Sequence, residues 1–212
     1  MRWHIWKTTL NERTMLINME IKPRQLEIIE VAGKLLTHSG ISGLTIKNLA
    51  SEMNFSEGAV YRHFKSKEEI MLTLLRHLHE NVVRIIGEVL MSGDFEEDFT
   101  SLFGKLARYF KNNPYYVVAV FSEGLMDGSD RINRKILQLI STLTGCVQVV
   151  IQKGQEQHLI IDSLSAEQIA QIVVPSFKHQ MFKWKMSNFT SDIEQEVDEL
   201  THALIRLLKV RT

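Results

Sequence analysis

The stretch of residues 44–70, LTIKNLASEMNFSEGAVYRHFKSKEEI, contains two short helical patterns that are separated by a tight break. Thr45 and Ser56 are side chains that cap helix N-termini, so we expect each of them to open one of the two helices. Asn54 tolerates a left-handed backbone and marks the turn between them. Ser66, with a glutamate three positions later, predicts a capping box and the start of a longer helix. A short helix, a tight turn and a second short helix place the second helix in the major groove of DNA.

The rest of the chain also follows helical spacing. With three prolines and eleven glycines in 212 residues, the sequence predicts an all-α protein. We expect nine helices in all. They are predicted at about residues 24–37, 45–53, 56–64, 66–89, 95–112, 114–123 and 131–153, and two more open at predicted capping boxes that begin at Ser165 and Ser191.

Charge is distributed unevenly along the chain, although the formal net charge is zero. Residues 1–67 hold ten Lys and Arg against six Asp and Glu, whereas residues 68–212 hold fifteen against nineteen. A basic N-terminal segment suits a DNA-binding module that is joined to a body with another task. We therefore expect a disordered arm or extension at residues 1–20, a helix-turn-helix domain at 21–67 and a helical body at 68–212.

The order of residues in this stretch resembles the signature of the tetracycline-repressor (TetR) family. Thr45 opens the second helix, Leu49 and Ala50 form an apolar pair within it, and Tyr61 and Phe64 stand three apart in the third helix. The resemblance covers about residues 25–75, and beyond it only the number and length of the helices agree. It departs from the family at the turn, where Phe55 is larger than the usual residue. The resemblance implies a dimeric, one-component transcriptional regulator, most simply a repressor, that a small molecule releases from a pseudo-palindromic operator.

The same resemblance implies two sets of DNA contacts. Hydroxyl, imidazole and ammonium groups would bind backbone phosphates and position the protein, whereas the start of the third helix and one lysine would read bases in double-stranded DNA. The phosphate-binding set is Thr45, Ser56, Tyr61, His63 and Lys67, and the base-reading set is Lys47, Glu57, Gly58 and Ala59.

Apolar residues recur along the last two predicted helices with the spacing of a packed helical stripe. The resemblance implies that these helices form a four-helix interface in a homodimer, and a two-fold operator also requires a dimer. The last helix carries a heptad seam of Ile193, Val197, Leu200, Leu204 and Leu207, and the helix before it carries a second stripe of Ile169, Val173, Phe177, Met181 and Trp184.

Aromatic and thioether side chains of the body could line a cavity for an unidentified, largely apolar small molecule, although residues at this spacing are more often plain core. The candidate lining residues are Phe110, Tyr115, Phe121, Phe177, Met181 and Trp184.

Several other classes of protein fit the sequence poorly. It shows no motif typical of an enzyme, no metal-ligand cluster and no run of apolar residues long enough to cross a membrane, so we expect no cofactor and no metal. The lone Cys146 lies in an apolar helical context, which favours a buried side chain and a reducing cytoplasm. The remaining alternative is a helical ligand-binding adaptor of the same fold that does not bind specific DNA.

Overall fold

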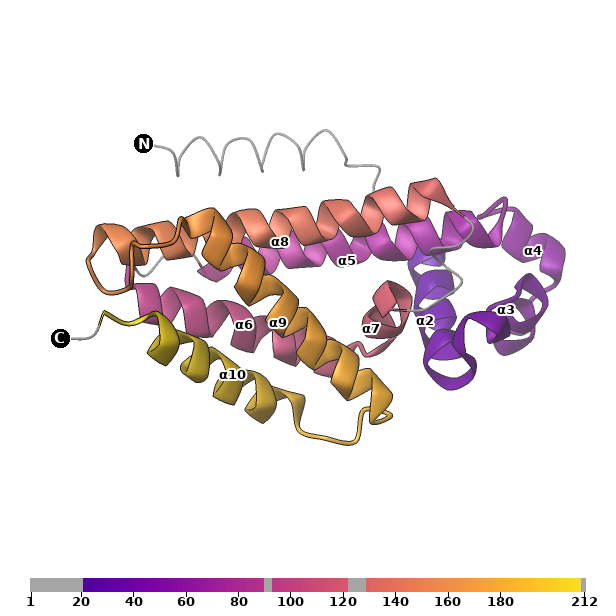
Figure 1. The fold of residues 1–212 in the computed structure, drawn as a ribbon. Helices are drawn as coiled ribbons and strands as arrows, with labels where there is room; N and C mark the ends of the chain where they lie inside the picture. The colour runs from indigo at the N-terminus through magenta and orange to yellow at the C-terminus, as the bar shows by residue number, and fades with distance from the viewer. Residues whose placement is uncertain (1–20, 90–92, 122–128, 211–212) are drawn as a thin grey trace. The chain divides into compact units, whose positions relative to one another are not determined.

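The computed structural model describes residues 21–89, 93–121 and 129–210. These residues form nine α-helices, so the predicted all-α fold is confirmed (Figure 1). The arm expected at residues 1–20 lies outside the described residues. The helices are α2 (Pro23–Gly43), α3 (Ile46–Glu52), α4 (Glu57–Tyr61), α5 (Lys67–Val89), α6 (Phe95–Asn112), α7 (Tyr115–Phe121), α8 (Asp130–Glu156), α9 (Ala166–Met186) and α10 (Ile193–Leu208).

The helices belong to two compact units. Among the described residues, the N-terminal unit contains residues 21–80, 113–121 and 129–138, and the C-terminal unit contains residues 81–89, 93–112 and 139–210. Helices α5 and α8 each contribute residues to both units. The helix-turn-helix domain predicted at residues 21–67 lies wholly in the N-terminal unit, which also includes α7.

The N-terminal unit is built around one buried face of α2. Ile28, Ala32 and Leu36 are fully or almost fully buried there, at the spacing of one helical side. Next to them, Gly33 allows α7 to approach closely, because a Cβ atom at this position would lie 2.6 Å from the ring of Tyr115. The absence of a side chain at residue 33 therefore sets how closely α2 and α7 pack.

Capping side chains start three of the described helices where the sequence indicates. Thr45 Oγ1 accepts a hydrogen bond from Asn48 N at 3.1 Å, and Ser56 Oγ accepts one from Ala59 N at 3.2 Å. At the start of α9, Ser165 and Gln168 form the complete predicted capping box. These local bonds satisfy backbone donors that have no partner inside a helix.

Two predicted caps differ from the observed ones. Ser66 Oγ accepts from the backbone N of Glu69 at 3.2 Å, but the Glu69 carboxylate accepts from Lys65 N at 2.7 Å, so the reciprocal bond of a capping box is not to Ser66. At the start of α10, the capping residue is Asp192, which accepts from Glu194 N, and not Ser191. Both shifts are by one residue, because neighbouring polar side chains compete for the same orphan backbone donors.

The C-terminal unit has an aromatic core along α6. Phe95, Phe99 and Phe103 are buried on one side of this helix, and the ring centroid of Phe103 lies 5.1 Å from that of Phe177 on α9. Beside them, the buried Asp98 accepts a 2.8 Å hydrogen bond from Lys153 Nζ on α8. This ion pair joins α6 to α8 in the interior, where leaving either charge alone would be costly.

Helix α8 is, by length and composition alone, apolar enough to cross a membrane. No apolar run of that length is expected from the sequence. Core helices of globular proteins meet the same criterion. In this helix Cys146, Val147 and Ile151 are buried within the protein. Burial raises the pKa of the Cys146 thiol well above its ordinary value, so the thiol stays protonated and acts as a small apolar group.

Candidate nucleic-acid interface

Helices α3 and α4 form a helix-turn-helix with a tight break between them. Asn54 has a positive φ of 53°, as the sequence predicts, and Phe55 N donates to the carbonyl oxygen of Ala50 at 2.8 Å. Leu49 on α3 and Val60 on α4 are fully buried. Each short helix therefore packs one apolar side into the core and leaves its other side exposed to solvent.

The predicted phosphate-binding hydroxyls lie on this available side. Thr45 and Ser56 are exposed at the N-termini of α3 and α4, where each hydroxyl oxygen accepts from the backbone and its hydrogen can still be donated. Tyr61, at the end of α4, has 51% of its surface exposed. A large aromatic side chain with a free polar end suits a phosphate contact.

The other two predicted phosphate ligands are partly buried. His63 is half-buried, and its backbone carbonyl accepts a 3.2 Å hydrogen bond from Gln25 Nε2. Lys67 Nζ donates to the carbonyl oxygen of Ile41 at 2.7 Å, and burial lowers the pKa of this lysine. Lys67 therefore ties the start of α5 to the end of α2, and an ammonium group has further donors that could reach a phosphate.

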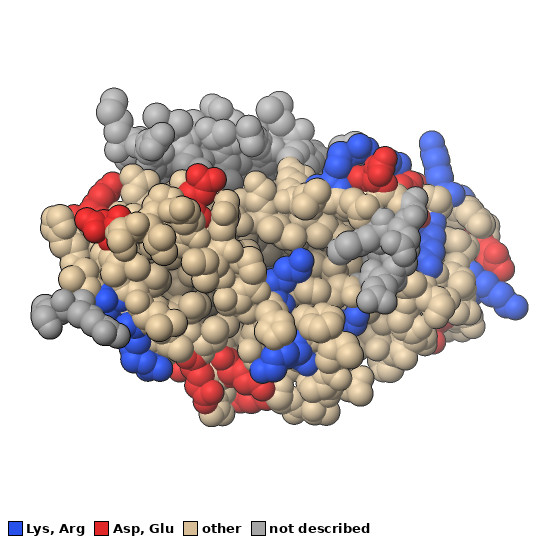
Figure 2. Space-filling view, in the orientation of Figure 1, with Lys and Arg blue, Asp and Glu red and all other residues tan. Residues whose placement is uncertain are grey.

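The predicted base-reading residues lie at the start of α3 and α4. Lys47, Glu57 and Gly58 are exposed, and Ala59 is half-buried. A Cβ atom at Gly58 would meet only Ser56 Oγ, at 3.9 Å, so the surface around this glycine is open to a close partner. Figure 2 shows both Lys or Arg and Asp or Glu side chains over the region of α3 and α4.

Phe55 is the residue at which the sequence departs from the family pattern. The guanidinium carbon of Arg24 on α2 lies 5.3 Å from the centroid of its half-buried ring, within the range of a cation–π contact. The larger side chain is thus held against α2 in this structure.

The heptad seam predicted on α10 divides between the interior and the surface. Ile193 and Val197 are fully buried within the single chain, whereas Leu200 and Leu204 are half-buried and Leu207 is 76% exposed. Ile193 and Val197 therefore pack in the protomer core. Only the C-terminal part of the seam offers apolar surface to a second chain.

Helix α9 has one buried apolar stripe and one exposed apolar stripe. The stripe predicted from the sequence, Ile169 to Trp184, is buried inside the protomer. The opposite side carries an apolar stripe that the sequence analysis missed, with Ile172, Phe182 and Met186 exposed by 55%, 40% and 66%. These residues share one side of the helix at helical spacing, which was a usable signal, but periodicity does not tell which of two stripes faces the core.

The predicted lining residues of an apolar cavity fall in both units. Tyr115 and Phe121 belong to the N-terminal unit, where Tyr115 packs on Gly33. Phe110, Phe177, Met181 and Trp184 are buried in the C-terminal unit. Phe110 and Phe177 lie together, with ring centroids 6.4 Å apart, whereas Trp184 Nε1 donates to the carbonyl of Ser191 at 3.1 Å and closes the corner after α9.

No group of three or more His, Cys, Asp or Glu residues in residues 21–89, 93–121 and 129–210 could hold a metal ion.

Comparisons with known proteins agree with this geometry. Residues 28–74 match the family model of bacterial regulatory proteins of the tetR family. The repressor AcnR of Corynebacterium diphtheriae is 31% identical over 71 residues, which cover 34% of this chain and 37% of that protein. The nucleoid occlusion factor SlmA of Colwellia psychrerythraea is 22% identical over 86% of this chain and 93% of its own.

A solved structure extends the likeness in fold beyond the helix-turn-helix. The transcriptional regulator FadR of Bacillus subtilis, crystallised in complex with stearoyl-CoA, superposes with a TM-score of 0.72 at 14% identity, over 85% of this chain and 97% of that one. The matched segment 28–74 contains the whole of α3 and α4 together with their core. The chain therefore carries the DNA-binding helix-turn-helix of the tetR family of bacterial regulatory proteins.

Proposed function

We propose that this regulator is a homodimeric repressor of a pseudo-palindromic operator and that a small molecule releases it. The observation that carries the proposal is the α3–α4 surface, where Thr45, Ser56 and Tyr61 are exposed while the apolar sides of both helices are buried. Lys47 on α3 and the residues at the start of α4 are also exposed and would contact bases. A dimer that covers its operator can repress by occlusion alone.

The exposed apolar side of α9 and α10 supports dimerisation. Ile172, Phe182 and Met186 on α9, together with Leu207 on α10, leave more apolar surface exposed than isolated positions would. A second copy of the chain would cover it through a symmetric four-helix contact. One short recognition helix also reads too few bases for specificity, so two copies would be needed on one operator.

We propose that the released state binds a largely apolar small molecule through the aromatic side chains of the helical body. The FadR structure with stearoyl-CoA makes long-chain acyl-CoA thioesters the first compounds to test. Titration of stearoyl-CoA into the protein on its own upstream DNA should lower the affinity of the complex. A coupling of about 1 to 3 kcal/mol would correspond to a 5- to 150-fold change in affinity.

Helix α5 offers the route for this coupling. It is continuous from Lys67 to Val89, and its residues belong to both units. A tilt of α5 would change the separation of the two recognition helices, which must match about 34 to 36 Å on DNA. Insertion of two glycines after Leu78 should leave both binding events intact and abolish ligand-driven release, whereas unchanged release would rule out this route.

Footprinting and genome-wide binding in the host test the function directly. A repressor should protect two symmetric half-sites at a small number of promoters. A single asymmetric half-site would contradict the dimer, and absence of any specific site would favour the adaptor alternative. Specific sites that all lie away from promoters would contradict a repressor.

A further inference from the structure

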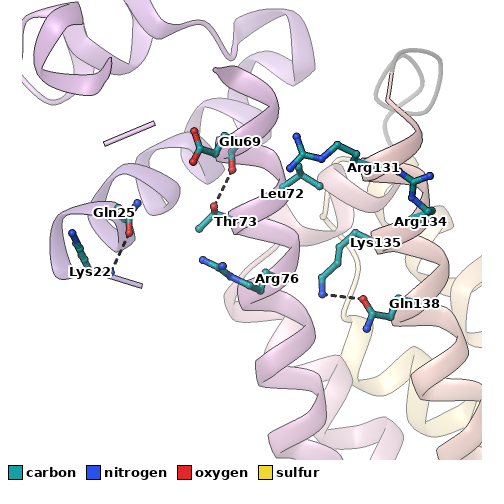
Figure 3. A pocket seen from close by; sticks show the side chains of 10 residues that line it. All are labelled: Lys22, Gln25, Glu69, Leu72, Thr73, Arg76, Arg131, Arg134, Lys135 and Gln138. Atoms are coloured by element: carbon teal, nitrogen blue, oxygen red, sulfur yellow. Dashed lines mark hydrogen bonds between the residues drawn. The ribbon is translucent and has the colours of Figure 1, made fainter. Parts of the chain in front are cut away.

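A polar pocket of about 650 Å³ opens in the N-terminal unit, and none of its lining residues belongs to the predicted DNA contacts or to the predicted apolar cavity. Its walls come from the start of α2, the N-terminal half of α5 and the first turns of α8, and Figure 3 labels the ten side chains that line it. The volume lies within the range of small-molecule sites, about 300–1,000 Å³. The charged lining residues are Lys22, Arg76, Arg131, Arg134, Lys135 and Glu69.

Positive charge exceeds negative charge in this pocket, since five of these side chains are cationic and one is a carboxylate. Arg131 is partly compensated by an ion pair with Glu68 at 3.2 Å. The side chains of Lys22 and Arg134 make no ion pair with any carboxylate in the described part of the chain. The pocket therefore holds cations whose charge nearby carboxylates do not balance.

Lys135 is a half-buried cation of this pocket. Its Nζ lies 3.3 Å from His79 Nδ1 and 3.1 Å from Gln138 Oε1, and both partners are neutral. Burial lowers the pKa of Lys135; Glu80 raises it and Arg76 lowers it. Burial, together with the charge of Lys135, also lowers the pKa of His79 to about 4, so this imidazole is uncharged at neutral pH. A bound anion would stabilise the charged form of Lys135.

Arg76 supplies a second sign of an incomplete site. Its Nε atom is buried and has no hydrogen-bond partner, and the nearest carboxylate oxygen, on Glu80, is 3.9 Å away. A buried donor without a partner costs free energy, which an acceptor from a ligand would recover.

We propose that this pocket binds a small anion that carries two or more phosphate groups, such as pyrophosphate or the phosphate chain of a nucleotide. One guanidinium group can donate to two phosphate oxygens at once. Arg76 on α5 and Arg131 and Arg134 on α8 supply three guanidinium groups to the lining of the pocket. One phosphate or carboxylate would use only part of a pocket of this size and charge. The site is separate from the predicted DNA contacts and from the proposed apolar effector.

Isothermal titration of the full-length protein at low ionic strength tests the proposal, with inorganic phosphate, inorganic pyrophosphate and ATP as the probes. Pyrophosphate and ATP should bind at one site per chain and more tightly than phosphate. Arg134→Gln should weaken the binding of both by about ten-fold, because one charge-assisted contact is lost. Arg134 is exposed, so this variant should fold normally. Lys34→Gln, the same loss of charge at an exposed residue of α2 outside the pocket, should bind like the parent protein.

Three outcomes would overturn the proposal. The first is a lack of saturable binding of all three anions. The second is equal weakening by Arg134→Gln and Lys34→Gln, which would indicate only general attraction by charge. The third is a variant that keeps its affinity for pyrophosphate but loses affinity for duplex DNA, which would assign Arg134 to the DNA surface. Lys135→Met provides an independent variant, and it should weaken pyrophosphate binding in the same way while circular dichroism shows the parent helix content.

Discussion

The helix-turn-helix and the α9–α10 pair use apolar residues in different ways. Helices α3 and α4 each have a single apolar side, which is buried, and their opposite sides are polar. Helix α9 has two apolar sides, one around the buried Phe177 and one around the exposed Phe182. The core of one chain accounts for a single stripe, whereas a second, exposed stripe is the surface that the proposed dimer would cover. Apolar surface left over after folding is thus the mark of the proposed dimer contact.

The largest expected effect separates the two parts of the α10 seam. Val197→Asp should lower the free energy of unfolding by on the order of 4 kcal/mol, because it places an unpaired charge in the protomer core. Leu207→Asp is the matched control on the same helix, and it should leave the stability of an isolated protomer within about 0.5 kcal/mol. Urea denaturation of the two variants measures this difference. Equal loss of stability would place Leu207 in the core as well.

The second expected effect concerns assembly. Phe182→Glu combined with Leu207→Glu should convert the dimer to a folded monomer, since like charges would face one another across the symmetric contact. Light scattering would measure the mass, and circular dichroism would confirm the helix content. Asp162, exposed before α9, offers a control in Asp162→Asn, which should remain dimeric. A dimer that persists in the double variant would remove this surface from the interface.

A smaller effect is expected at the phosphate-binding side chains. Lys67→Ala should weaken binding to every DNA sequence and reduce the slope of log affinity against log salt by about 0.9, because one phosphate neutralisation is lost. Tyr61→Phe should weaken binding without changing the slope, since a hydroxyl carries no charge. Competition titrations at several salt concentrations give both quantities. A changed base preference without general loss would refute both assignments.

The smallest effect tests the turn between α3 and α4. Asn54→Ala should lower the free energy of unfolding by about 1 kcal/mol, because alanine adopts the φ of 53° poorly. Asn54→Gly should be nearly neutral. Thermal denaturation with both variants distinguishes backbone strain from loss of the amide side chain, which would destabilise both.

The helix-turn-helix was predictable because its helix caps and its turn depend on short-range interactions. Thr45, Ser56 and Asn54 act within a few residues of their own position, so the sequence carries their roles directly. The second, exposed stripe of α9 could not be told from the buried one for the opposite reason. Whether Phe177 or Phe182 faces inward depends on packing against α6, as the Phe103–Phe177 contact shows, and that contact joins segments far apart in the chain.

The cationic pocket was also beyond the reach of the sequence. Its charged residues come from three separate segments, and each of them alone has the ordinary appearance of a solvated lysine or arginine on a helix. Only the fold of the N-terminal unit brings Arg76 and Lys135 near one another. The hydrogen bond between Lys135 and His79 likewise joins residues 56 positions apart.

The burial of Cys146 has a practical consequence for spectroscopy. It is the chain's single cysteine, and its thiol is enclosed and protonated, so thiol-directed probes should leave it unmodified in the folded protein. A cysteine introduced at exposed Glu57 would then be the one reactive site in each chain. In a symmetric assembly, a spin label at that position would report the distance between two recognition helices in the wild-type background, before and after an effector is added.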